Sequence, residues 1–284
     1  MKKPTIKKAL VVYKDDGAFR ALSGRSKPGS LIARIKKAAL SPRLTLQKVE
    51  QALSKRKIPY RVLPRSRLKT ASDYDLLITV GGDGTFLDSS HYCPPRAVLL
   101  GVNSDPRLSH GAFCIANGKT FEKILSNFLK GLGPVSLLHR LKVSIDGRPL
   151  PVLALNDVLF ANRSPAGTSR YFLKAGNRWE EQKSSGVWVS TAAGSTAAIR
   201  SAGGRILPKH SRMIQYVVRE PFMKKGKRLK LLRGRLSPRR SIRIYSTMSR
   251  AAVFLDGAHL HYDVKYGDVV EIRPARNPIR AVLK

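Results

Sequence analysis

Residues 81–85, Gly-Gly-Asp-Gly-Thr, combine the residue types best suited to chemistry in this chain. They follow the apolar run Asp75–Val80, which predicts a buried strand. Three glycines allow the backbone to approach a ligand closely and to turn its N–H groups toward an anion. The single carboxylate, Asp83, could hold a metal ion or polarise a hydroxyl group that attacks phosphorus. Both roles indicate phosphoryl transfer, and the alternative is a plain glycine-rich turn.

The loop differs from two widespread phosphate-binding patterns. No Gly-Lys-Ser/Thr follows at the spacing of a Walker A loop. Leu87 stands where the third glycine of a Rossmann fingerprint would fall. Its expected position, at the carboxyl end of a parallel strand, is nevertheless where open α/β sheets bind ligands.

Two further segments combine small and polar residues. Residues 190–198 read Ser-Thr-Ala-Ala-Gly-Ser-Thr-Ala-Ala, and Ser-Ala-Gly-Gly follows at 201–204. Such a stretch can bring N–H groups and hydroxyls close to a phosphate or a flat ligand, or it can begin a tightly packed helix. Asn156 and Asp157 interrupt the apolar run Val152–Phe160, where buried polar groups need partners. They could form a satisfied structural pair or reach the hydroxyls of a bound sugar.

The elements that position these groups fall into two regions. Residues 1–133 alternate apolar, β-branched runs with helical patterns, which is typical of a parallel sheet with helices on both faces. We expect this region to be an α/β nucleotide-binding domain that carries the loop at 81–85. The patterns predict strands at 9–13, 60–63, 76–80 and 97–102, helices at 44–57 and 121–132, and a loop around a short helix near 30–39 within residues 14–43.

Residues 134–284 have a different pattern. Short β-rich runs recur there with turn signals between them, including Asp146-Gly147 and Asp256-Gly257. Asp-Gly pairs after alternating strands are hairpin signals. This region is therefore expected to be an all-β, sandwich-like domain.

The charge balance is extreme, with 54 Lys and Arg residues against 18 Asp and Glu, or +36 in total. Nucleic-acid binding, attraction to anionic lipid, and a solvated surface that attracts small anionic substrates could each explain it. The basic residues are spread over the whole chain, and no helix-turn-helix, zinc-finger or RNA-binding signature is present. We therefore favour the solvated surface and expect no specific nucleic acid as a partner.

The chain lacks the features of a membrane or disulfide-rich protein. It has no run of 18 apolar residues, and 42% hydrophobic residues are enough for a packed core. Its two cysteines, Cys93 and Cys114, form neither a disulfide framework nor a metal-ligand spacing. We expect a cytoplasmic protein with two reduced thiols and no membrane partner.

Taken together, the motifs resemble those of the NAD kinases. Residues 81–87, Asn156-Asp157, residues 190–204 and Asp256-Gly257 occur in the order and rough spacing of that family, which covers the chain from about residue 75 to 273. Four segments also resemble the plant-type NADH kinase branch, namely residues 101–106, 184–186, 190–198 and 219–221.

The resemblance implies an N-terminal α/β domain, a C-terminal β-rich domain that binds the dinucleotide, and an active site between them. It implies transfer of the γ-phosphoryl group of ATP to the 2′-hydroxyl of the adenosine ribose of NAD or NADH, giving NADP or NADPH. Mg²⁺ or another divalent cation would be held mainly by the ATP phosphates. The family tends to form dimers or tetramers, so a homodimer or homotetramer is expected.

The site residues carry over one at a time. Asp83 would polarise the 2′-hydroxyl, and the phosphates would lie along Gly81, Gly82, Gly84 and Thr85. Asn156 and Asp157 match the family's Asn-Glu pair, which holds the nicotinamide-side ribose. The remaining positions would line the dinucleotide (Thr196, Ala197 and Ser201) or pack on its adenine (Phe113).

Three departures from the family leave the redox form of the substrate open. Asp157 replaces the usual Glu, Ala198 a common Tyr, and Ser185 an Asp found in many members. Two of these changes remove or withdraw negative charge near the nicotinamide ring, so oxidised NAD need not be preferred over NADH. The phosphoryl donor is also open, since polyphosphate could replace ATP.

Two rival functions remain at the level of the sequence. Lipid kinases of the diacylglycerol or sphingosine type share the loop at 81–85, but there Asn-Glu follows directly, whereas this chain has Phe86-Leu87-Asp88. They also have no place for residues 190–198. The other rival is a catalytically weak nucleotide-binding module that uses its charge to bind nucleic acid.

Overall fold

The computed structural model describes residues 3–14, 29–107, 109–223, 225–226 and 228–283. The chain divides into two compact units, the first comprising Met1–Leu137 with Ile279–Lys284 and the second Leu138–Pro278. No helix in the described ranges has the length and apolar character needed to cross a membrane.

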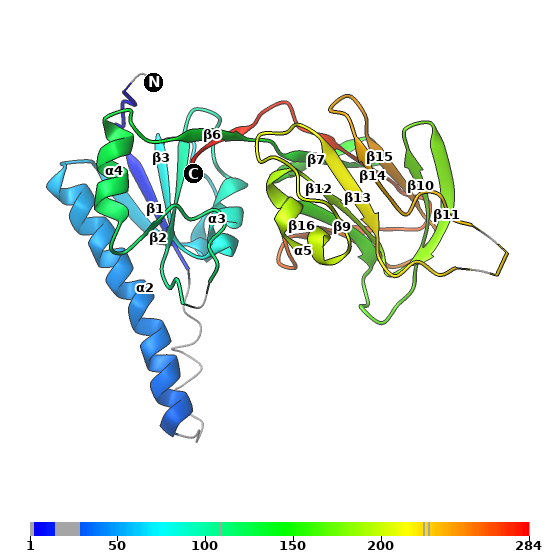
Figure 1. Cartoon of the computed structure of the whole chain (residues 1–284), viewed down its shortest axis with the longest axis horizontal. Coiled ribbons are helices and arrows are strands. Elements are labelled where there is room, and N and C mark those ends of the chain that lie inside the picture. The colour runs from blue at the N-terminus through cyan, green and yellow to red at the C-terminus, as the bar shows by residue number, and fades with distance from the viewer. Residues whose placement is uncertain (1–2, 15–28, 108, 224, 227, 284) are drawn as a thin grey trace. The chain divides into compact units, whose positions relative to one another are not determined.

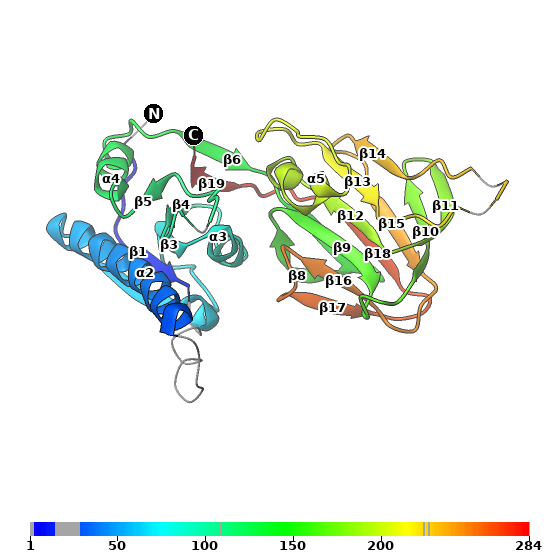
Figure 2. The same cartoon turned by 60° about the horizontal axis from the view of Figure 1, so that its bottom comes forward.

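The first unit is built on a seven-stranded sheet, in the order β2-β1-β3-β4-β19-β6 with β5 also on β4 (Figures 1 and 2). The pairs of β1 with β2 and β3, and of β4 with β3, β5 and β19, are all parallel. The central strands are buried along their length because helices cover both faces. Their bounds are β1 (Ala9–Tyr13), β2 (Tyr60–Pro64), β3 (Leu76–Gly81), β4 (Val98–Asn103), β5 (Ala116–Asn117), β6 (Val135–Leu138) and β19 (Ile279–Val282).

Three helices and one short turn complete the described part of this unit. The helices are α2 (Gly29–Lys55), α3 (Asp83–Ser90) and α4 (Phe121–Leu129), and the 3-10 turn is η1 (Arg65–Arg67). Residues Leu53 of α2 and Leu125 of α4 share one core cluster with alternate residues of β1, β3 and β4. Phe86 of α3 lies on the other face, where a Cβ added at Gly101 would come within 3.1 Å of its ring. The predicted α/β domain with helices on both faces is confirmed.

The region before the second strand differs from the prediction. Instead of a loop, a short helix near 30–39 and a separate helix from residue 44, the structure has the single helix α2, with Pro42 inside it. Proline removes a helical N–H and usually ends a helix, which is why the sequence favoured a break there. Thr45, which lies inside this helix, directs its Oγ1 to the carbonyl of Ser104 at 3.4 Å. Residues 15–28 of the predicted loop lie outside the described residues.

The end of the chain returns to the first unit. The sequence placed the boundary at 133/134 and assigned everything after it to the β-rich domain, whereas the structure divides after residue 137 and again after 278. The reason is β19, which pairs in parallel with β4 through Arg280 with Val98 and Val282 with Leu100. Its buried Val282 belongs to the same core cluster as Val98, Leu100 and Val102 of β4.

The second unit is a β-sandwich of two six-stranded sheets, one in the order β11-β10-β15-β18-β7-β8 and the other β14-β13-β12-β9-β16-β17. All pairings with assigned register are antiparallel, so the predicted all-β region is confirmed. The strands are β7 (Leu141–Ile145), β8 (Arg148–Ala154), β9 (Asp157–Asn162), β10 (Ser169–Ala175), β11 (Arg178–Ser184), β12 (Val187–Ser190), β13 (Ile214–Val218), β14 (Arg233–Leu236), β15 (Ile242–Ser246), β16 (Ala251–Leu255), β17 (His261–Val264) and β18 (Val269–Pro274).

The sandwich core follows from alternation along each strand. Inward-facing residues of both sheets form one buried cluster, in which Phe160 of β9 meets Tyr171 of β10 edge-on at 5.4 Å between ring centroids. Two short helical turns interrupt the β-structure after β12, η2 (Ala193–Thr196) and α5 (Ala198–Ser201). They carry the small-residue segment that the sequence singled out.

Candidate active site

Asp83 stands at the junction of β3 and α3. Gly81 ends the strand, Gly82 precedes the helix, and Asp83 is its first residue, where the helix dipole favours a negative charge. Its two carboxylate oxygens each accept a backbone N–H, from Ala112 to Oδ2 and from Phe113 to Oδ1, both at 2.8 Å. The carboxylate is therefore held in one orientation by a loop some 30 residues later in the chain.

The described part of that loop, residues 104–107 and 109–115, packs against the glycines through Ser109. The Asn103 side chain organises it, donating from Nδ2 to the Ser109 carbonyl at 2.9 Å and accepting at Oδ1 from the Asp105 N–H at 3.1 Å. A Cβ at Gly82 would come within 2.7 Å of Ser109 Oγ, and one at Gly81 would overlap Thr85 Oγ1. Both glycines are thus required by close packing as well as by their suitability for an anion.

Two candidate residues carry buried polar atoms without a partner in the described part of the chain. Thr85 is 1% exposed, and its Oγ1 makes no hydrogen bond. Asn156, 9% exposed, leaves its Oδ1 unpaired in the same way. Buried polar atoms are normally satisfied, so an unpaired one at a candidate site is a place where a ligand group can bind.

Phe113 and Cys114 lie beside Asp83. The ring of Phe113 is buried and stacks on Phe86 at 5.0 Å with an interplanar angle of 10°. Phe113 therefore contacts Asp83 through its backbone N–H and Phe86 through its ring. Burial, with a smaller contribution from the Asp83 charge, raises the pKa of the Cys114 thiol to about 12. Cys114 is therefore a neutral thiol at physiological pH and not a nucleophile.

In the second unit, Asp256 fixes the backbone of the Asn-Asp pair. Its carboxylate accepts three successive N–H groups, from Leu155 at 2.7 Å, Asn156 at 2.6 Å and Asp157 at 3.1 Å. Asp256 itself has a φ of +53°, which Asp tolerates better than most residues. Three converging donors on one carboxylate are a strong arrangement, so the segment before β9 is rigidly placed.

Asp157 is the most perturbed carboxyl group of this half-site. It is 4% exposed at the start of β9. Burial, and then the neighbouring Asp256 charge, raise its pKa to about 7. A carboxyl group poised near neutrality can accept or donate a hydrogen bond to a sugar hydroxyl, which is typical of functional sites.

The small-residue segment packs directly against this pair. Thr191 donates from Oγ1 to the Leu155 carbonyl at 2.6 Å and from its N–H to the Asn156 carbonyl at 2.9 Å. The beginning of the segment is buried, whereas Thr196 and Ser201 are exposed and Ala197 is partly so. Both alternatives from the sequence therefore apply, since one end packs tightly and the other is open to a ligand.

Gly194 makes the closest approach in this segment, and its replacement tests the packing. A Cβ at this position would overlap the Asn156 carbonyl. We expect Gly194→Ala to displace the Asn156 backbone, to lower the free energy of unfolding by about 2 kcal/mol and to weaken dinucleotide binding. Urea unfolding and NADH titration measure the two effects.

Gly84→Ala is the matched stability control, because a Cβ there meets nothing closer than Arg65 Nη1 at 3.7 Å. It lies in the first turn of a helix, where Ala is favoured over Gly. Equal destabilisation by the two changes would show that the close approach at Gly194 is not what requires the glycine.

The structure thus gathers the predicted residues into two clusters, one in each unit. Gly81, Gly82, Asp83, Gly84 and Thr85 lie at the start of α3. Asn156 and Asp157 lie against the segment that carries Thr196, Ala197 and Ser201. The sequence did not reveal Asn103 or the carboxylate role of Asp256, although the Asp-Gly pair at 256–257 marked a position that tolerates a positive φ.

No protein-family model matches the chain. A probable NADH kinase from rice is 35% identical over 261 residues, covering 84% of this chain and 80% of that protein. The fold is similar to an NAD kinase from Archaeoglobus fulgidus in complex with ATP, with a TM-score of 0.71 at 23% identity over 97% of this chain and 93% of the other. It is also similar to yeast NADH kinase complexed with NADH, with a TM-score of 0.73 at 17% identity over 99% and 84%. Because the similarity to the rice protein extends over most of both sequences, the chain belongs to the NAD(H) kinase family.

Proposed function

We propose that this enzyme transfers the γ-phosphoryl group of ATP to the 2′-hydroxyl of the adenosine ribose of NAD or NADH. The observation that carries the proposal is the Asp83 carboxylate, fixed by two N–H groups at the start of α3 and surrounded by glycines. Phosphoryl transfer depends mainly on positioning the reactants and stabilising charge. The fixed carboxylate can position the ribose hydroxyl, and the glycine-rich loop beside it can position the phosphates and stabilise their charge.

Each residue has a part in the reaction. Asp83 orients the ribose hydroxyl and accepts its proton late, because a sugar hydroxyl is a very weak acid. The N–H groups of Gly82 and Gly84 would face the phosphates at the start of α3, with Gly81 beside them. Thr85 donates its N–H to the Gly82 carbonyl at 3.0 Å, so it would bind a phosphate oxygen through its unpartnered Oγ1. Asn156 Oδ1 and the Asp157 carboxyl bind the hydroxyls of the nicotinamide-side ribose.

A divalent cation would neutralise charge on the ATP phosphates. No group of three His, Cys, Asp or Glu side chains that could hold a metal ion occurs among the residues described. Mg²⁺, which keeps several waters and favours phosphate oxygens, fits this ligand set because it needs one carboxylate at most. The loop glycines then position the phosphates and Asp83 orients the ribose hydroxyl, so neither is needed as a metal ligand.

The dinucleotide-binding residues are completed by Thr196, Ala197 and Ser201, with Phe113 at the adenine. The face of the Phe113 ring that contacts Phe86 is occupied, so adenine would meet its other face or its edge. A cytoplasmic location and a homodimer or homotetramer stay predictions, and light scattering of the purified protein checks the latter.

The direct test is to incubate the purified protein with ATP, Mg²⁺ and either NAD or NADH, and to measure the 2′-phosphorylated product. We expect product with both dinucleotides. Replacing ATP by polyphosphate in a parallel reaction identifies the donor. If the folded protein forms no product with NAD and none with NADH, the proposed function is contradicted.

Reduced NADH is expected to be used at least as efficiently as NAD. Oxidised nicotinamide is a cation, and this chain has Ser185 where many relatives have a carboxylate. Ser185 is partly exposed and lines a cavity of about 480 Å³. A new carboxylate there should attract the cationic ring by about 1 kcal/mol, so Ser185→Asp should raise kcat/KM for NAD relative to NADH about fivefold.

Ser185→Asn is the matched control for size and polarity without charge. It should leave the ratio of the two kcat/KM values within about twofold, which is less than 0.5 kcal/mol. If both substitutions change the ratio equally, charge beside the nicotinamide does not decide the redox form.

A further inference from the structure

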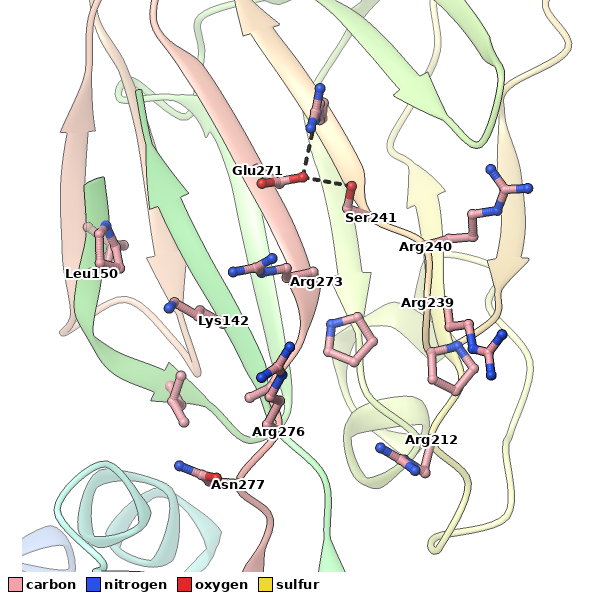
Figure 3. Close-up of a pocket in the computed structure, with 16 residues that line it drawn as sticks. Lys142, Leu150, Arg212, Arg239, Arg240, Ser241, Glu271, Arg273, Arg276 and Asn277 are labelled. Atoms are coloured by element: carbon pink, nitrogen blue, oxygen red, sulfur yellow. Dashed lines mark hydrogen bonds and ion pairs between the residues drawn. The ribbon is translucent and has the colours of Figure 1, made fainter. Parts of the chain in front are cut away.

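The second unit has a large basic groove that the kinase reaction does not use. Its volume is about 1200 Å³, and it is lined by residues of β7, β8, β15 and β18 and of the loops next to them. Seven of the lining residues are cationic and one, Glu271, is acidic (Figure 3). The cations are Lys142, Arg212, Arg239, Arg240, Arg243, Arg273 and Arg276.

Most of this charge is available to a ligand. Glu271 is engaged by Arg243 at 3.1 Å and by Ser241 at 2.9 Å. Arg212, Arg239 and Arg276 are exposed, and no ion pair between them and a carboxylate occurs among the described residues. Figure 3 shows Lys142, Arg273 and Arg276 close to one another on one side, with Arg239 and Arg240 across the groove. A concave surface with a surplus of guanidinium groups favours phosphates of a chain-like polyanion.

The same sheet face continues into exposed aromatic side chains. Tyr171 and Leu173 point into the core, so their neighbours Phe172 and Lys174 point outward. Register then places Arg243 opposite Lys174, and Tyr245 opposite Phe172, on that outer face. Trp179 of β11 also pairs with Lys174, is 66% exposed, and lies 5.6 Å from Phe172 between ring centroids.

Aromatic rings and cations therefore share one continuous face. Across neighbouring strands, Trp179 pairs with Lys174, Lys174 with Arg243, and Arg243 with Glu271. In the last pair of strands, β18 and β7, Arg273 lies opposite Lys142. Four strand spacings give this row a length of about 19 Å. Proteins that bind single strands without sequence preference combine these two features, a basic groove for the backbone and aromatic rings for the bases.

We propose that this face, the groove together with Trp179, Phe172 and Tyr245, binds single-stranded nucleic acid without reading its sequence. A second copy of the chain is disfavoured as the occupant, because a two-fold contact would set the cations of one copy against those of the other. An anionic membrane is flat and would not fill a groove. The sequence alone suggested a diffusely charged surface, but the fold concentrates part of that charge beside stacking rings.

The test uses the full chain and fluorescein-labelled oligo(U) and oligo(dT) of about 20 nucleotides, with fluorescence anisotropy at several salt concentrations. We expect binding at about 50 mM salt that weakens steeply as salt rises. Arg239→Glu with Arg273→Glu should weaken it at least tenfold and reduce the salt slope by about 1.4, the effect of two phosphate contacts on a single strand. Arg239→Gln with Arg273→Gln repeats the test with less risk to folding.

The matched control is Arg250→Glu with Lys265→Glu, which changes the charge equally at two exposed positions outside the groove. It should weaken binding by less than about threefold. Kinase activity, retained in both double variants, shows that each is folded.

Trp179→Ala separates stacking from charge. It should weaken binding about tenfold with an unchanged salt slope, and it should abolish the quenching of tryptophan emission that the oligonucleotide causes. The proposal is overturned if the protein does not bind the oligonucleotides at low salt, or if the groove and control double variants lose affinity equally. It is also overturned if a duplex binds as tightly as a single strand and Trp179→Ala does not change the affinity. If the protein binds anionic vesicles but not oligonucleotides, the face is assigned to a membrane instead.

Discussion

Asp83→Asn is expected to lower kcat for phosphorylation of NADH by about 10³-fold. The substitution removes the only charge that could accept the proton of the ribose hydroxyl at this loop. It also disturbs the loop geometry. Asp83 accepts two N–H groups through two oxygens, and the Asn amide offers one oxygen and one NH₂ group. One N–H, of Ala112 or Phe113, therefore faces another donor.

Loss of the catalytic group can be separated from loss of the fold. Thermal unfolding with and without ATP reports whether the variant is folded and still binds the donor. Asp83 contributes to the raised pKa of Cys114, so in Asp83→Asn that thiol should react faster with a thiol reagent at alkaline pH. This change needs only the loss of a neighbouring negative charge, whether or not catalysis is affected.

Asp83→Glu is the control that keeps the charge and moves it by one methylene. Some activity should return, because a carboxylate is restored near the hydroxyl. If Asp83→Asn keeps kcat within tenfold of the parent, Asp83 does not accept the proton, although membership of the family is unaffected. In that case the helix N-terminus and the bound phosphates would supply most of the rate enhancement.

The carboxyl end of β3 was predictable from local sequence. Residues 76–80 are apolar except for Thr79, all five are buried, and glycines follow directly. Such a run ends where small residues let the backbone turn, so Asp83 could be placed at a strand end without any knowledge of contacts. The alternation in residues 141–145 and 242–246 marked the sandwich in the same way, because one face of each strand is buried.

Features that depend on distant partners could not be predicted. The helix α2 continues through Pro42, and Ser41 directs its Oγ to the Ser104 carbonyl at 2.7 Å, a contact across 63 residues. The strand β19 is a run of four residues, and its partner residues in β4 lie 182 positions earlier in the chain. Local patterns identify the element type, but only packing decides which sheet receives it.

The site shows the same division. The three N–H groups that converge on Asp256 come from residues about 100 positions earlier. Phe113 could be named from the sequence as a candidate, but its stacking on Phe86 depends on how residues 104–107 and 109–115 fold. The chemistry of Asp83 follows from its own type and neighbours, whereas the restraint on its carboxylate follows from tertiary structure.

Asp157→Asn is expected to stabilise the ligand-free protein above neutral pH while weakening dinucleotide binding. The pKa of Asp157 in the folded protein is raised to about 7 from 3.8, mainly by burial. Between these values the folded state holds a proton that the unfolded state has lost, so the free energy of unfolding falls as pH rises through this window. Above pH 7 the full penalty applies, up to about 4 kcal/mol for a shift of about three pKa units.

Asn cannot ionise, so the variant should lose this pH dependence. Urea unfolding at pH 4, 6 and 8 should show parent and variant nearly equal at pH 4 and the variant more stable at pH 8. The control Asp263→Asn replaces an exposed carboxylate that is paired with Arg163, and it should change stability by less than about 1 kcal/mol.

NADH titration at pH 8 should show weaker binding by the Asp157→Asn variant than by the parent, because Asn offers the ribose hydroxyls a weaker acceptor than a carboxylate. Equal stability of parent and variant at pH 8 would mean that Asp157 ionises without penalty. A buried carboxyl group kept at such a penalty, and lost together with affinity, would mark Asp157 as a residue selected for binding the dinucleotide rather than for folding.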